Sequence, residues 1–120
     1  MGNKLPKTMH IGTIGELLVQ LRLLEYGIQA APPIKDSGND LIAIRGEVVR
    51  FIQVKTSHGR ITSVGGLPGV YHIVALVELE YSEGDNLLID QSRIFVFRKD
   101  EAIAEKRELS QAVVNELWNE

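Results

Sequence analysis

Cysteine is absent from the 120 residues of this chain, which excludes disulfide bonds and metal sites built on thiolates. The chain also lacks an apolar run of the ~18 residues that a membrane-spanning helix needs. Its first ten residues, Met1 to His10, are polar and have no apolar segment of the kind found in a signal peptide. We therefore expect a cytoplasmic protein without a membrane partner.

Positive charge is scarcer than negative charge, with 13 Lys and Arg residues against 16 Asp and Glu residues and a net charge of −3. Strong nonspecific binding of nucleic acid normally requires a basic surface. The balance does not exclude an enzyme that acts on nucleic acid, because metal ions held by clustered carboxylates reverse the local charge. The cations would then have to be concentrated on one face.

Several common catalytic signatures are missing. There is no Gly-x-Ser-x-Gly elbow and no cysteine nucleophile. The glycine-rich segment 65–69 lacks the Lys and Ser/Thr that complete a phosphate-binding loop. The three histidines, His10, His58 and His72, have no helical metal-ligand spacing, so we expect no histidine metal site.

The first predicted element is a helix from Gly12 to Tyr26. It is indicated by an apolar stripe at three- and four-residue spacing, formed by Ile14, Leu17, Leu21 and Leu24. Thr13 is expected to cap the helix, with Glu16 in capping-box register, and Gly27 to end it.

Strands rich in Ile, Val and Phe are expected to follow. They are a short edge strand Ile28 to Pro32, then Asp40 to Arg45, Val48 to Thr56, Tyr71 to Leu79 and Arg93 to Arg98. Ser57 to Val70 should be a loop, and helices are expected at Asp100 to Glu108 and Ser110 to Trp118. This order predicts one α/β domain over residues 1–120, with a single mixed β-sheet, an N-terminal helix, C-terminal helices and flexible residues 1–10.

Gly46 and Glu47 fit a two-residue hairpin turn. Arg45 would then pair with Val48, and Asp40 would lie opposite Gln53 on one face of the sheet. Strand alternation places Lys55 on that same face. A loop one residue longer would break the parity and put Asp40 opposite Val54.

An acid, an amide and an ammonium group at one end of a hairpin suit phosphodiester hydrolysis, which needs a divalent cation to activate water. Oxygen ligands suit Mg²⁺, and Asp40, the Gln53 amide and the Val54 carbonyl offer them. Lys55 would orient the water and stabilise negative charge. Glu16 and Gln20 flank the apolar helix stripe, where the helix would meet the sheet.

These residues resemble the pattern of PD-(D/E)xK nucleases. The resemblance rests on Gly15-Glu16, Asp36-x-Gly38-x-Asp40-Leu41 and Gln53-Val54-Lys55, in the style of archaeal Holliday-junction resolvases and Mrr-type endonucleases. It implies a restriction-endonuclease-like fold, Mg²⁺ (with Mn²⁺ as a substitute) and DNA as substrate. It also implies that Asp40 is the central metal-binding aspartate, Lys55 the motif lysine and Glu16 the helix glutamate.

Two features depart from that pattern. Gln53 stands where most members carry an acid, although Mrr-type members also have Gln there, and the metal site loses one negative charge. The segment Ser57 to Val70 is rich in glycine where many members have a helix, which bears on the substrate cleft. Further substrate contacts are expected from Gln20, Asp36, His58 and Arg60.

Simpler interpretations stay open for each residue. Lys55 could be a solvent-facing strand lysine, and Gln53 an exposed or hydrogen-bonded strand amide. Asp40 and Asp36 could be turn residues. Glu16 could serve only the capping box.

The sequence thus predicts a magnesium-dependent endonuclease acting on branched or duplex DNA. A homodimer is expected because so small a domain offers little surface for substrate. The alternatives are a catalytically inactive nucleic-acid-binding or protein-interaction module on the same fold, and a structural protein with a chance motif. DNA and RNA are not distinguished.

Overall fold

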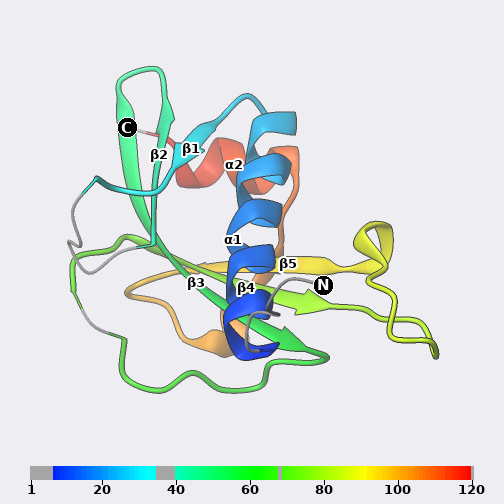
Figure 1. Ribbon diagram of the computed structural model, residues 1–120. Coiled ribbons are helices and arrows are strands. Elements are labelled where there is room, and N and C mark those ends of the chain that lie inside the picture. The colour runs from blue at the N-terminus through cyan, green and yellow to red at the C-terminus, as the bar shows by residue number, and fades with distance from the viewer. Residues whose placement is uncertain (1–6, 35–39, 68, 120) are drawn as a thin grey trace.

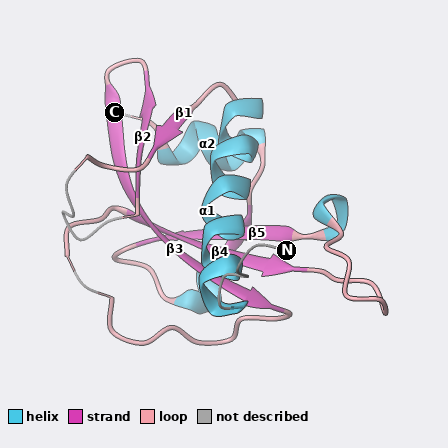
Figure 2. Ribbon diagram, in the orientation of Figure 1, coloured by secondary structure: helices cyan, strands magenta, loops and turns pink. Residues whose placement is uncertain are grey.

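A computed structural model of the chain describes residues 7–34, 40–67 and 69–119. These residues form a six-stranded sheet in the order β1-β2-β3-β4-β5-β6 (Figures 1 and 2). The strands are β1 (Gln29–Ala31), β2 (Leu41–Arg45), β3 (Val48–His58), β4 (Ile73–Leu79), β5 (Arg93–Arg98) and β6 (Arg107–Glu108). The helices are α1 (Lys7–Glu25) and α2 (Gln111–Leu117), with 3₁₀ turns η1 (Ile89–Gln91) and η2 (Ile103–Glu105). Neighbouring strands are antiparallel except β3 and β4, which are parallel, so the predicted mixed α/β sheet is confirmed.

Both helices pack on one face of the sheet. Leu18, Val19 and Leu23 of α1 and Val114 and Leu117 of α2 share one core cluster with residues of β2 to β5. A second, smaller cluster on the opposite face joins Val74, Leu76 and Phe97 to Ile61 of the loop after β3. Strand β4 is covered on both faces, which explains its nearly continuous apolar sequence.

Helix α1 differs from the expectation in its start and in its buried face. It begins at Lys7, so Thr13 lies inside it and is not its cap. Leu17, Leu21 and Leu24 of the predicted stripe are 59%, 51% and 63% exposed. Apolar residues occur on more than one side of this helix, and periodicity alone did not identify the side that faces the sheet. That side carries Gly15, the position at which the backbone can approach a strand most closely.

The predicted helix Asp100 to Glu108 is wrong. The segment forms η2 and then β6, which pairs with β5. Glu108 makes an ion pair of 2.9 Å with Arg93 of β5, so cross-strand pairing overrides helix propensity.

The second C-terminal helix is confirmed as α2, and the Ser110 hydroxyl accepts a hydrogen bond of 3.3 Å from the Val113 N–H as its cap. The C-terminal aromatic Trp118 is buried, and its Nε1 donates to the Ala43 carbonyl at 3.2 Å.

Other boundaries move by a few residues. Strand β1 is shorter than expected, and β3 continues to His58 before the predicted loop begins. Residues 7–10, expected to be flexible, belong to α1, whereas residues 1–6 lie outside the described residues. Within the described residues, no helix combines the length and apolar character that crossing a membrane requires.

Candidate active site at the open edge of β3

The β2–β3 hairpin has the predicted register. Arg45 pairs with Val48 and Leu41 pairs with Ile52, across a turn in which Gly46 adopts a φ of 61°. A positive φ at the first turn residue favours glycine and suits a tight hairpin. The parity on which the sequence argument depended is therefore confirmed for β2.

Strand β3 is longer than its hairpin partner. Its first part, Val48 to Ile52, pairs with β2, and its second part, Ile52 to His58, pairs with β4. From Gln53 onward, β2 no longer covers the edge of β3 that faced it. The Asp40 carboxylate and the Val54 backbone meet at this open edge.

Asp40 fills the beginning of the gap. Its N–H donates to the Ile52 carbonyl at 3.0 Å, so Asp40 and Leu41 both lie opposite Ile52, the two-to-one arrangement of a β-bulge. Asp40 was expected opposite Gln53, and the slip of one position changes its direction, as bulges do. Its Oδ2 atom accepts a hydrogen bond of 2.8 Å from the Val54 N–H, which holds the carboxylate at the edge of β3.

The same hydrogen bond gives the direction of the Val54 carbonyl. In an extended strand, the N–H and C=O of one residue point to the same side. The Val54 N–H points to Asp40, so the Val54 carbonyl is directed to that side of β3 as well. A carboxylate and a backbone oxygen therefore face the same gap.

Gln53 and Lys55 lie on the sheet face opposite the two helices. They pair with Val74 and Leu76, which belong to the smaller core cluster. Gln53 is only 7% exposed, and Lys55 is exposed. Gln53 is therefore buried beside the smaller core cluster, and the ammonium group of Lys55 is accessible from solvent.

Glu16 reaches the site because α1 touches β3 at Gly15. A Cβ atom at Gly15 would lie 1.8 Å from the Thr56 hydroxyl oxygen, a distance that no side chain tolerates. Glu16 lies in the middle of α1, so the capping-box interpretation of this residue is wrong. Burial, and to a lesser extent the negative charge of Asp40, raise the pKa of Glu16 above the usual value of a glutamate. The two carboxylates therefore lie within electrostatic range of each other.

The remaining predicted residues are divided. Arg60 is exposed and lines the same hollow as Lys55. His58 packs edge-on against Tyr81, with ring centroids 4.5 Å apart, and strand alternation puts it on the α1 face, away from Lys55. Gln20 is half-buried one turn after Glu16. Asp36 lies outside the described residues.

The donor set suits a hard cation. The donor set predicted from the sequence has two carboxylates, Glu16 and Asp40, and the neutral oxygens of Gln53 and Val54. Asp40 and Val54 meet at the edge of β3, whereas Gln53 lies on the sheet face opposite α1. Mg²⁺ retains several waters and needs only a few protein oxygens. Among the described residues, no group of three or more His, Cys, Asp or Glu side chains could hold a metal, so any ion here would rely on the neutral donors.

The comparison with solved structures is the informative one. No family model matches the chain, and no curated protein matches it. A solved structure, that of the bacterial homing endonuclease I-Ssp6803I, superposes with a TM-score of 0.52 over 88% of this chain and 79% of that chain. This chain shares its fold with an endonuclease. At 16% sequence identity, the similarity concerns the fold alone.

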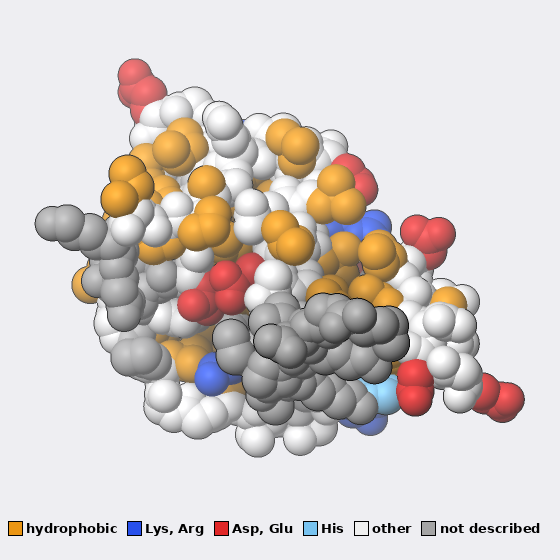
Figure 3. Space-filling model, in the orientation of Figure 1, with side chains coloured by type: hydrophobic (Ala, Val, Ile, Leu, Met, Phe, Trp, Pro, Cys, Tyr) orange, Lys and Arg blue, Asp and Glu red, His pale blue; other side chains and the backbone are white. Residues whose placement is uncertain are grey.

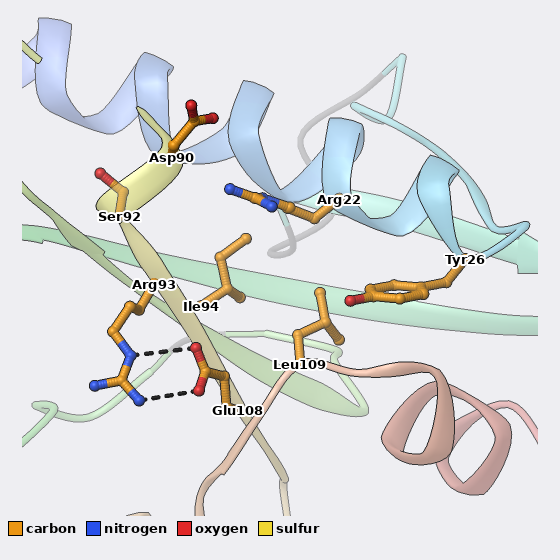
Figure 4. A pocket seen from close by; sticks show the side chains of 8 residues that line it. All are labelled: Arg22, Tyr26, Asp90, Ser92, Arg93, Ile94, Glu108 and Leu109. Atoms are coloured by element: carbon orange, nitrogen blue, oxygen red, sulfur yellow. Dashed lines mark hydrogen bonds and ion pairs between the residues drawn. The ribbon is translucent and has the colours of Figure 1, made fainter. Parts of the chain in front are cut away.

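A second pocket lies between α1, β5 and the segment that leads into α2 (Figure 4). Its charged lining residues are Arg22, Asp90, Arg93 and Glu108. Arg93 and Glu108 point toward each other and are paired, and the Arg22 guanidinium donates to the Ile89 carbonyl at 3.3 Å. The Arg93 charge is therefore balanced by Glu108, and Arg22 already has a hydrogen-bond acceptor.

Proposed function

We propose that this protein is a magnesium-dependent endonuclease of the PD-(D/E)xK type that hydrolyses phosphodiester bonds in DNA. The observation that carries the proposal is the Asp40 carboxylate, fixed by the Val54 N–H at the open edge of β3, with Glu16 coupled to it electrostatically. The fold shared with a homing endonuclease supports the same activity.

Each residue has a distinct role in this proposal. Asp40, Glu16, Gln53 and the Val54 carbonyl hold Mg²⁺, and Mn²⁺ is an acceptable substitute. When bound, the ion supplies Lewis acidity that lowers the pKa of water and offsets phosphate charge. Lys55 orients the attacking water and stabilises the negative charge that develops on the phosphate.

Gln53 sets the charge of the site. Two carboxylates balance one divalent cation, and an amide at the third position adds an oxygen ligand without adding charge. A buried carboxylate at this position would be costly in the absence of metal. The arrangement therefore suits a single tightly placed ion.

Gln53 also favours a second function, that of a non-catalytic binding module. With Gln53 in place of an acid, and without a cluster of three acidic or histidine ligands among the described residues, the protein would serve as a binding module that retains the fold and has lost the metal. Measurement of Mg²⁺ or Mn²⁺ binding by calorimetry separates the two, because the module has no site that Asp40→Asn would remove.

The proposed enzyme acts as a homodimer through the apolar stripe of α1, defined as half-buried Ile14 and exposed Leu17, Leu21 and Leu24. Figure 3 shows hydrophobic side chains gathered over this helix, and Ile14, Leu17 and Leu21 line an apolar groove of about 200 Å³ with Leu87 and Ile89. The spacing along the stripe is three, four and three residues, which is the same in both directions. Such a stripe is complementary to itself when two helices meet antiparallel about a two-fold axis, as an isologous interface requires.

Light scattering tests the dimer. Leu21→Glu, at an exposed position, should convert a dimer to a monomer without loss of fold, whereas Glu25→Gln on the same helix should leave the dimer intact. A wild-type monomer at micromolar concentration contradicts this part of the proposal.

The activity itself is tested by incubating supercoiled plasmid and four-way-junction DNA with the protein and Mg²⁺ or Mn²⁺. The proposal expects cutting that EDTA abolishes and that Asp40→Asn lacks. Absence of cutting on every DNA substrate, with either metal, would leave the binding module as the better account.

A further inference from the structure

A hollow of about 360 Å³ lies beside Lys55. One wall is the end of β3, from Lys55 to Ser57, and the other is the loop from Arg60 to Gly65. We call it the basic hollow, because its charged lining residues, Lys55 and Arg60, are both cations and the described residues that line it include no acid.

This charge pattern is unusual in the molecule. The chain carries a net charge of −3, and the two other described pockets with charged linings contain both signs. One has Asp90 and Glu108 beside its arginines, and the other has Asp100 and Glu116. A pocket lined by cations alone, in an acidic protein, indicates a site for an anion.

The loop that forms the outer wall is anchored at Ile61. This side chain is buried in the smaller core cluster with Val74, Leu76 and Phe97. Its N–H donates to the Glu78 carboxylate at 2.9 Å, so the nearest acid of β4 is engaged by the backbone. With Ile61 held inward, its neighbours Arg60 and Thr62 are exposed.

The lining groups match the chemistry of a phosphodiester. Arginine, lysine and hydroxyl side chains make most of the contacts that proteins form with the phosphates of DNA. The hollow adds the hydroxyl-bearing residues Thr62 and Ser63 of the loop to its two cations. Neither hydroxyl residue was recognised in the sequence, because a glycine-rich loop gives no periodicity that assigns its side chains to a surface.

We propose that the basic hollow binds the backbone phosphate adjacent to the one that is cleaved, with Arg60 as its principal contact. The inference rests on the proposed nuclease function, because Lys55 belongs to both the hollow and the candidate active site. It assigns to the loop Arg60 to Gly65 the task of holding the DNA strand beside the reacting phosphate.

The test compares Arg60→Ala with Arg45→Ala, which removes an equal charge at the hairpin end of β2, where the Arg45 guanidinium donates to Asn115 at 2.8 Å. Fluorescence anisotropy measures the affinity of each protein for labelled duplex and four-way-junction DNA as salt rises from ~50 to ~200 mM. Arg60→Ala should lower the slope of log affinity against log salt by about one, the effect of one lost phosphate contact. Arg45→Ala should keep the wild-type slope.

A second variant tests the hydroxyl groups. Thr62→Val combined with Ser63→Ala removes neutral donors, so it should weaken DNA binding without altering the salt slope, because no counterion is involved. Equal affinity of this variant and the wild type would remove the hydroxyls from the site.

Cleavage measured on the same samples separates the hollow from the proposed enzyme. Suppose that wild type cuts DNA, and that Arg60→Ala matches Arg45→Ala in affinity, salt slope and cleavage rate. The phosphate site in the basic hollow is then wrong, and the nuclease proposal stands. If Arg60→Ala lowers the slope but no protein cuts DNA, the hollow is a phosphate-binding site of a non-catalytic DNA-binding module, and the nuclease proposal is wrong. Failure of the wild type to bind DNA at ~50 mM salt overturns both.

Discussion

The Oδ2 atom of Asp40 accepts a 2.8 Å hydrogen bond from the backbone N–H of Val54, 14 residues further along the chain. The bond closes the gap that opens where β3 extends beyond β2, and it fixes a carboxylate beside a backbone carbonyl. The stability of the fold and the proposed metal site therefore both depend on this hydrogen bond.

Asp40→Asn and Asp40→Ala should have different effects on stability. Asparagine keeps an oxygen that accepts from the Val54 N–H, so Asp40→Asn should fold with nearly wild-type stability and lose metal binding. Alanine leaves that N–H without its acceptor and should reduce the free energy of unfolding by about 1–3 kcal/mol. Urea denaturation measures both. Equal stabilities for the two variants would show that the hydrogen bond contributes nothing to the fold.

Gly15→Ala should damage the contact between α1 and β3. The new methyl group would collide with Thr56, and overpacking of this kind costs about 1–3 kcal/mol. Gly12→Ala on the same helix is the matched control, because nothing lies within 4 Å of its added Cβ and alanine favours helix by up to about 1 kcal/mol. The account expects opposite signs in thermal unfolding. If both variants are stabilised, α1 does not pack as described.

The pH dependence of stability should report on Glu16. Burial and the Asp40 charge raise its pKa in the folded protein above 4.5, so the folded state holds this proton more tightly than the unfolded chain. The stability that results is complete below about 4.5 and is lost as pH rises through the folded pKa. Glu16→Gln stays neutral, so it should be more stable than wild type at pH 7 and equal to it at pH 4. If Glu16→Gln were more stable than wild type at pH 4 but not at pH 7, the pKa of Glu16 would not be raised by folding.

Gln53→Glu should make stability depend on Mg²⁺. The new carboxylate would replace a side chain that is 7% exposed, and burial of its charge would be costly in the metal-free protein. A bound ion would relieve that cost, and binding to the folded state raises Tm. Differential scanning fluorimetry should therefore show a lower Tm than wild type without metal and a larger increase on adding Mg²⁺. An increase no larger than that of the wild type would remove Gln53 from the ligand set.

The sequence predicts the β2–β3 hairpin register better than it predicts the elements around it. Hairpin parity followed from Gly46 and Glu47, because a two-residue turn leaves one register for β2 and β3. The slip at Asp40 was not predictable, since a bulge depends on where β2 begins relative to β3. The buried side of α1 was missed because Leu17 and Leu18 are equally apolar, and only the approach at Gly15 determines which one faces the sheet.

The segment before α2 was also predicted wrongly from the sequence. Asp100 to Glu108 has the composition of a helix, yet Arg107 and Glu108 pair with β5. Local propensity is outweighed there by an edge strand and an ion pair with Arg93, and both partners are distant in sequence. Contacts of that kind are set by the fold, and a single sequence does not show them.

The most direct test of the central claim is cleavage of plasmid and four-way-junction DNA by wild type, Lys55→Ala and Lys99→Ala in Mg²⁺ or Mn²⁺. Lys99 is an exposed lysine that follows β5, so its loss controls for charge. The account predicts metal-dependent cutting by wild type and Lys99→Ala, and a rate for Lys55→Ala that is lower by about 10²-fold or more, the usual effect of removing one group that stabilises transition-state charge. Cutting by Lys55→Ala at the wild-type rate would contradict the account, because it would place the active site elsewhere.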